Sequence, residues 1–171
     1  MNGPKKYYGK YRGVVVDNVD LLHLGRIQAI VPDVSNVIPT TWAMPCVPIA
    51  NKAAGTFVVP QIGSGVWIEF EHGDPDHPIW VGGYWGIAAE TPPLSLLATP
   101  GDPPIIISTT AQHTIMLSDL PLPPLATGGI LLLSGASSVM IGPESIQITS
   151  PSILVNGVTV FNAGALVVAL P

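Results

Sequence analysis

The sequence has a single cysteine, Cys46, and no lysine or arginine after Lys52. One cysteine excludes an internal disulfide, so the fold must be held by packing and hydrogen bonds. Charged residues make up only 10% of the chain, whereas hydrophobic residues make up 47%. A compact monomer of this composition would leave a large apolar surface in water. The composition therefore indicates an obligate oligomer.

Long hydrophobic runs are also missing. No uninterrupted apolar stretch approaches the ~18–20 residues that span a bilayer, and the longest candidate is residues 163–171. The basic start, with Lys5 and Lys6, is not followed by an apolar segment. We therefore expect no signal peptide and synthesis in the cytoplasm.

The charge is divided unevenly along the chain. Residues 1–52 carry six bases and three acids, a balance of +3, and residues 53–171 carry eight acids and no base, a balance of −8; the sum is −5. A net acidic protein repels nucleic acid and anionic lipid, so neither is an expected partner.

Windows that could form helices are scarce. The chain has 19 prolines and 18 glycines, and no window of a dozen residues both lacks these breakers and shows a 3.6-residue period. The first half has five strand-like runs, at residues 11–17, 25–31, 41–49, 66–71 and 79–84. Residues 73–76 form a turn that joins the last two runs as a hairpin. The pattern predicts an all-β chain that begins with a small five-stranded barrel.

The second half consists of short apolar runs between turn formers. They fall at residues 105–107, 113–117, 130–133, 139–141, 146–148, 153–155 and 158–160. A three-residue strand offers only one or two inward side chains, so we expect that the segment cannot close a core alone and that its partner strands come from elsewhere. Residues 120–127 interrupt the repeat, and we expect them to form an outward loop.

Several segments resemble one known family. In the first half they are residues 11–15 (YRGVV), 24–32 (LGRIQAIVP), Trp42, Gly55, 60–70 (PQIGSGVWIEF) and above all 71–83 (EHGDPDHPIWVGG). In the second half they are residues 112–119 (QHTIMLSD) and 140–151 (MIGPESIQITSP). These segments are similar to phage baseplate assembly protein V and to the valine-glycine-repeat spike proteins of type VI secretion.

The resemblance implies a fold and an assembly. It implies an OB-fold barrel over residues 1–88, a proline-rich connector over 89–103 and a spike shaft with tip over 104–171. In the family, three copies intertwine into a triple-stranded β-helix, which would provide the missing partner strands and make the chain a homotrimer. The side chains expected at the shared trimer core are Ile146, Ile148, Ile153, Val155, Val158 and Val160.

The function implied by the resemblance is mechanical. The chain would be the central spike of a contractile phage tail or a related injection system, with the barrel end at the baseplate hub and inner tube, and it would pierce the target envelope. Some family members close their tip with a His-x-His metal motif, which this sequence lacks. We therefore expect a separate PAAR-type tip protein to bind the apolar residues Leu166, Val167, Val168, Ala169 and Leu170.

Reactive chemistry has little support in the sequence. Glu71, His72, Asp74, Asp76 and His77 contain metal-ligand types, but they surround a turn that accounts for the aspartates, and no third histidine is near. Cys46 has no flanking base and is interpreted as a small core residue. There is no Gly-x-Ser-x-Gly motif and no room for an inserted lysozyme-like domain. We expect a protein that is not an enzyme and has no cofactor, catalytic residue or metal.

A binding module is the alternative function. OB folds commonly bind oligonucleotides or oligosaccharides, and stacking aromatics are present, among them Trp42, Trp67, Trp80, Tyr84 and Trp85. The net charge of −5 offers no electrostatic attraction for nucleic acid.

Overall fold

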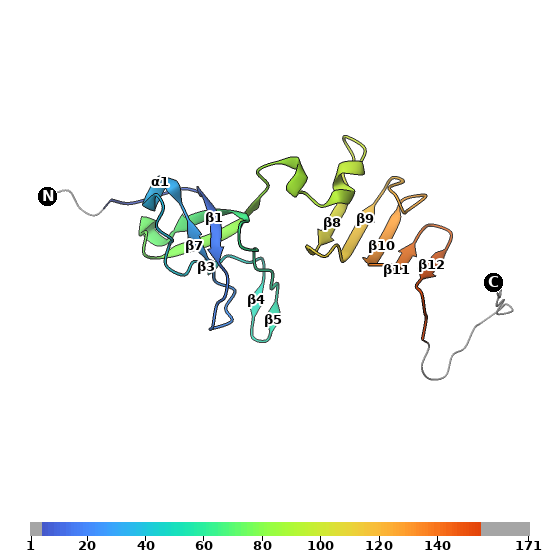
Figure 1. Cartoon of the computed structure of the whole chain (residues 1–171), viewed down its shortest axis with the longest axis horizontal. Helices are drawn as coiled ribbons and strands as arrows, with labels where there is room; N and C mark the ends of the chain where they lie inside the picture. The colour runs from blue at the N-terminus through green and yellow to red at the C-terminus, as the bar shows by residue number, and fades with distance from the viewer. Residues whose placement is uncertain (1–4, 155–171) are drawn as a thin grey trace. The chain divides into compact units, whose positions relative to one another are not determined.

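The computed structural model describes residues 5–154, and within them the chain is essentially all-β (Figure 1). The helical pieces are single turns: α1 (Pro32–Ser35), η1 (Glu71–Gly73), η2 (Ala88–Glu90) and η3 (Pro93–Leu97). None of the described helices is long and apolar enough to cross a membrane. The chain divides between Glu90 and Thr91 into two compact units.

The first unit is a curled five-stranded sheet of the OB type. Its strands are β1 (Tyr11–Asp17), β2 (Gln28–Ile30), β3 (Met44–Pro45), β6 (Gly65–Phe70) and β7 (Pro78–Tyr84), in the order β2-β1-β6-β7-β3. Neighbours are antiparallel except β3 and β7, which are parallel. The expected OB-type fold is confirmed as a curled half-barrel, although only Met44–Pro45 of the run at 41–49 forms a strand.

A small hairpin was not predicted. It consists of β4 (Ala50–Asn51) and β5 (Ala54–Gly55), which pair antiparallel. Two-residue strands are too short to show a period of two, so the sequence carries no pattern that would predict them. Gly55 is required there, since a Cβ at this position would lie 2.5 Å from the carbonyl oxygen of Ile49.

The core of the first unit follows the alternation of β6. Val66, Ile68 and Phe70 alternate with Trp67 and Glu69 along the strand; the first three are buried, and the other two lie on the other face. The three buried side chains pack with buried side chains of neighbouring elements, namely Val15, Ile27, Ala29, Val31, Ala43 and Trp80.

The turn between β6 and β7 forms as expected. The backbone N–H of Asp76 donates to Oδ1 of Asp74 at 3.1 Å, and the N–H of Glu71 donates to the carbonyl of His77 at 2.9 Å. Asp74 therefore organises the turn with its own carboxylate.

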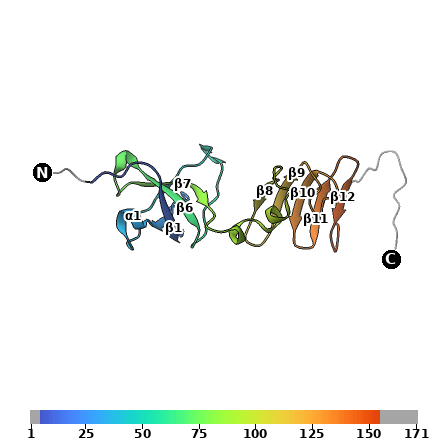
Figure 2. The same cartoon turned by 90° about the horizontal axis from the view of Figure 1, so that it is seen from above.

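The second unit contains a five-stranded antiparallel meander. Its strands are β8 (Ile105–Ser108), β9 (Thr114–Ser118), β10 (Gly129–Ser134), β11 (Ser137–Ile141) and β12 (Ile146–Thr149), and each pairs with its neighbour in sequence (Figure 2). The expectation that the partner strands come from elsewhere is therefore corrected for β8–β12. Short turns allow each strand to fold back on the one before it, and the chain provides its own ladder.

The expected outward loop at 120–127 is also corrected. Leu122 and Leu125 are buried and pack against Met116 of β9 and Leu131 of β10. Leu94, from the expected connector, packs against the same cluster. The leucines fold back because they cover one apolar face of the sheet.

Candidate functional site

The opposite face of the second sheet is apolar and uncovered. Its ten side chains lie in two cross-strand rows that run through all five strands, and we call this surface the open face. The first row is Ile105, Leu117, Ile130, Ile141 and Ile146; the second is Ile107, Ile115, Leu132, Val139 and Ile148. Apart from Val139, which is half-buried, these side chains are between 37% and 67% exposed in the single chain.

The two faces of the sheet differ in chemistry. On the covered face the middle row begins with Ile106, Met116 and Leu131 and ends at Gln147 on β12. Thr149, also on the covered side of β12, is exposed and polar. The open face stays aliphatic to β12 and carries no charged residue among its ten positions, so covering it would require no charge to leave water.

The open face represents a large unused stabilisation. Full burial of an aliphatic side chain contributes about 1.5–3 kcal/mol, and roughly half of each side chain is still exposed here. The ten positions together could contribute on the order of 10 kcal/mol per chain, comparable to the total stability of an ordinary domain. A large exposed apolar surface of this kind is typical of a protein contact surface.

The residues predicted for the trimer core are placed in part by the structure. Ile146 and Ile148 lie on the open face, one in each row. Ile153 is 59% exposed and follows the last strand. Val155, Val158 and Val160, and the predicted tip residues from Leu166 to Leu170, lie outside the described residues.

Sequence reasoning missed the other eight residues of the open face. Each run shows every second residue apolar, but the runs are so short that the intervening positions are often apolar too, as in Ile105-Ile106-Ile107. The register between hairpin partners, which selects one of the two faces, was the missing information.

The residues weighed as metal ligands lie around the β6–β7 turn. Nδ1 of His77 is 3.9 Å from Oδ2 of Asp74, and Nζ of Lys6 is 3.8 Å from the same oxygen. Within residues 5–154, no group of three or more His, Cys, Asp or Glu side chains is arranged to hold a metal ion.

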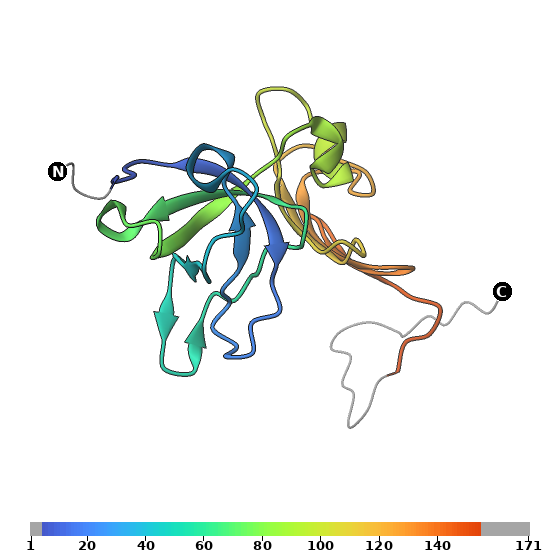
Figure 3. The same ribbon diagram turned by 60° about the vertical axis from the view of Figure 1, so that its left-hand side comes forward.

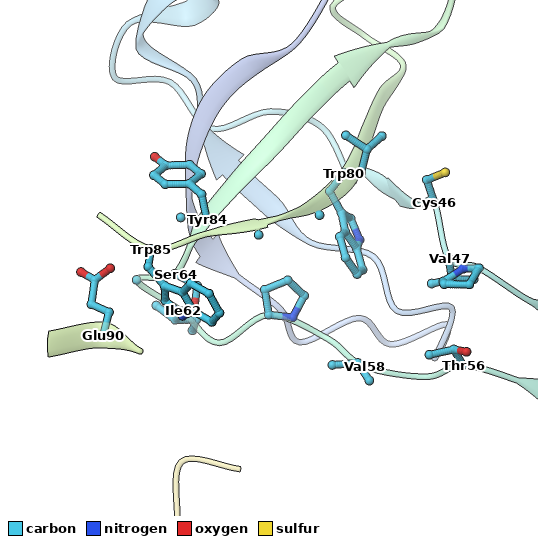
Figure 4. Close-up of a pocket in the computed structure, with 17 residues that line it drawn as sticks. Cys46, Val47, Thr56, Val58, Ile62, Ser64, Trp80, Tyr84, Trp85 and Glu90 are labelled. Carbon is cyan, nitrogen blue, oxygen red and sulfur yellow. The ribbon is translucent and has the colours of Figure 1, made fainter. Parts of the chain in front are cut away.

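The first unit has an open apolar cleft of about 1040 Å³ (Figure 4). Trp80, Tyr84 and Trp85 line it together with Cys46. The expectation that Cys46 is a core residue is wrong, because its side chain is exposed at this cleft. The single charged residue in the lining is Glu90, and its Oε2 accepts a hydrogen bond from the backbone N–H of Gly86 at 2.6 Å. The cleft offers aromatic surface but no lysine or arginine for a phosphate, so it gives no support to nucleic-acid binding.

A buried ion pair shapes the loop between β1 and β2. The carboxylate of Asp20 accepts hydrogen bonds from the backbone N–H groups of Leu22, Leu24 and Arg26, and from Nε and Nη2 of Arg26 at 3.1 and 2.6 Å. The hydrogen bond from Arg26 lowers the pKa of Asp20 far below its ordinary value, and Asp20 in turn raises the pKa of Arg26. The Arg26 guanidinium also lies 5.4 Å from the ring centre of Trp42.

Comparison with known protein families finds two matches. Residues 11–85 match the type VI secretion system/phage-baseplate injector OB domain, which covers the curled sheet from β1 to β7. Residues 104–167 match the phage baseplate V C-terminal trimerisation domain, which includes all five strands of the open face. No curated protein matches the chain.

Proposed function

The chain belongs to the phage baseplate V family, a family of structural phage and type VI secretion baseplate components, and we propose from this premise that it is the envelope-piercing central spike of a contractile injection system. Its C-terminal domain is a trimerisation domain, so the chain is a homotrimer that assembles into a phage or injection particle. The puncturing role, the tip protein and the hub contacts form the proposal.

The observation that carries the proposal is the open face. Three copies can each direct this face toward a common axis, so that every row meets its two symmetry equivalents and a dry aliphatic core results. The proposed core combines the ten residues of the open face with the sequence-predicted Ile153, Val155, Val158 and Val160. A dry core between hydrogen-bonded sheets makes a stiff rod without any reactive side chain.

The proposal also assigns parts of the chain. Residues 1–88 form the OB domain that meets the hub and inner tube, residues 89–103 connect, and residues 104–171 form shaft and tip. The proposed role is mechanical and not enzymatic. The apolar residues Leu166, Val167, Val168, Ala169 and Leu170 would seat a PAAR-type tip protein, since the sequence has no His-x-His motif of its own.

The proposal is tested first by mass and then by tip binding. Native mass measurement should give three times 17.8 kDa, and a mass of one chain would overturn the spike. Pull-down with the PAAR-type protein of the same system should be lost when Ala165 to Pro171 are deleted. The control is Thr149→Ser, at an exposed position on the covered side of β12, and this variant should retain binding. Equal capture of the tip protein by the deletion variant would refute the assignment of residues 166–170 to tip binding.

A further inference from the structure

The first unit carries a second exposed apolar surface, on the loop between β1 and β2. Val19, Leu21, Leu22 and Leu24 are 65%, 85%, 63% and 49% exposed. Phe57, which follows the β4–β5 hairpin, is 70% exposed. We call these five residues the end patch.

The loop and the segment after the hairpin lie side by side, and both project from one end of the first unit (Figures 1 and 3). Nδ2 of Asn18, at the start of the loop, donates a hydrogen bond to the carbonyl of Pro60 at 2.9 Å. At the end of the loop, a Cβ on Gly25 would lie 3.4 Å from the ring of Phe57. Phe57 therefore lies against the end of the loop that carries the four aliphatic side chains.

The end patch is held in place by buried polar contacts. The Asp20 carboxylate binds three backbone N–H groups of the loop and the Arg26 guanidinium, and Asp20 is only 8% exposed. Because the backbone is fixed, the four aliphatic side chains cannot collapse onto the barrel. A rigid exposed apolar patch is suited to binding a partner, because little conformational entropy is lost when it becomes buried.

The electrostatics of the end patch favour a second copy of this chain as its occupant. Around a three-fold axis, equivalent surfaces meet each other, and like charges would then repel. The five side chains are uncharged, and the nearby Asp20 and Arg26 neutralise each other. The one other carboxylate beside these side chains in the described part of the loop, that of Asp17, accepts a hydrogen bond from the backbone N–H of Val19 at 2.9 Å. By contrast, the exposed Arg12 on the outer side of β1 lies over the rings of Trp67 and Tyr84, and a symmetric contact there would bring three guanidinium groups together.

The size of the end patch favours a contact between copies that are already tethered to one another. Five partly exposed side chains offer roughly 500 Å² per copy, less than the ~800 Å² that each side of a standard interface buries. Free copies would not associate through it. The trimerisation domain, however, tethers three copies at an effective concentration of about millimolar.

We propose that the end patch packs against the same patch of the other two copies, so that the OB domains form their own apolar contact around the three-fold axis. This inference rests on the proposed trimeric spike. It assigns the loop between β1 and β2, where OB folds commonly bind oligonucleotides or sugars, to self-association.

The test is a cysteine cross-link in the full chain. Leu22→Cys is made in a Cys46→Ser background, because equivalent residues near a three-fold axis can reach disulfide distance. Mild oxidation should link two of the three copies, giving a covalent dimer and a monomer on a non-reducing gel. Ile38→Cys in the same background is the matched control: it is 67% exposed in the same unit and should not cross-link.

A second variant separates the inference from the proposed function. Leu21→Arg combined with Leu24→Arg should leave the trimer mass unchanged but abolish the Leu22→Cys cross-link. A trimer in which neither Leu22→Cys nor Leu21→Cys cross-links, even with a short bismaleimide, would overturn the self-contact and leave the spike intact. A monomeric mass for the Cys46→Ser parent would overturn both.

Discussion

Asp20 is the residue on which the shape of the OB unit's loop most depends. Its carboxylate is nearly buried and serves three backbone N–H groups as well as the Arg26 side chain. An asparagine of the same size has only one acceptor oxygen and would direct its own N–H₂ group at these donors. The loop would lose its fixed geometry, and with it the arrangement of the exposed leucines.

We expect Asp20→Asn to lower the thermal midpoint of the first unit and to increase proteolysis within residues 18–26. Asp33→Asn is the control, because Asp33 is exposed in α1 and should have little effect. The measurement is a melt followed by tryptophan fluorescence. Equal midpoints for the two variants would contradict the role given to Asp20.

The same ion pair predicts an acid sensitivity. The pKa of Asp20 is lowered in the folded state, mainly by Arg26, so the folded state binds this proton less readily than the unfolded chain. The stabilisation is fully present above the ordinary carboxyl pKa of about 4 and is lost as the pH falls below it toward the folded-state value. Wild type should lose stability between about pH 4 and pH 2 more steeply than Asp20→Asn; parallel curves would argue against it.

At the scale of elements, the glycines at the two ends of β10 differ in the substitutions that each position tolerates. Gly129 begins the strand with a φ of +154°, and a Cβ there would lie 2.2 Å from the carbonyl oxygen of Ile141. Gly135 has a φ of +58° in the two-residue turn after β10, and a Cβ there would meet nothing within 4 Å. The first position is closed to any side chain, whereas the second requires only a left-handed backbone.

We expect Gly129→Ala to destabilise the second unit by about 1–3 kcal/mol or more, because either the pairing of β10 with β11 or the backbone at position 129 must shift. Gly135→Asn should cost only a few tenths of a kcal/mol, since asparagine tolerates a positive φ. Chemical denaturation of both variants, followed by circular dichroism, measures the difference. A Gly129→Ala protein as stable as Gly135→Asn would show that β10 and β11 do not pair in this register.

The elements also show what the sequence can and cannot predict. The strand β6 was predicted as a run at 66–71, and the alternation of Val66, Ile68 and Phe70 with Trp67 and Glu69 already places the first three on one face, which the structure buries. The turn around Asp74 was predictable because Gly, Pro and Asp act locally. Leu122 and Leu125 were expected on the outside because residues 120–127 interrupt the repeat of short apolar runs, and only the three-dimensional proximity of Met116 and Leu131 accounts for their burial.

The same limit explains the open face. Resemblance to a family indicated a trimeric shaft, and two of the expected core residues, Ile146 and Ile148, lie on that face. The remaining eight could not be selected, since in a run such as Ile130-Leu131-Leu132 the residue types on both faces are alike. Only the hairpin register distinguishes them, and it assigns Leu131 to the covered face and its two neighbours to the open one.

At the scale of the whole molecule, the proposal that the open face forms the trimer core can be tested by placing an aspartate at either of two neighbouring positions in β12. Ile148 and Thr149 are adjacent in β12 and both are exposed in the single chain. Ile148 lies on the open face and Thr149 on the opposite one. If the sheet worked as a monomer, an aspartate would be tolerated equally at either position.

In the trimer the two positions differ sharply. Ile148→Asp would bring three carboxylates toward a shared apolar axis, where each loses its hydration and repels the other two, at a cost of several kcal/mol per charge. Thr149→Asp would keep its charge in water. The measurement is light scattering across a concentration series. We expect Ile148→Asp to be dissociated, or to form a trimer only at acid pH, where the carboxylates are neutral. Thr149→Asp should be trimeric at every pH and concentration. If both variants form trimers of equal stability, the chains associate through a surface other than the open face.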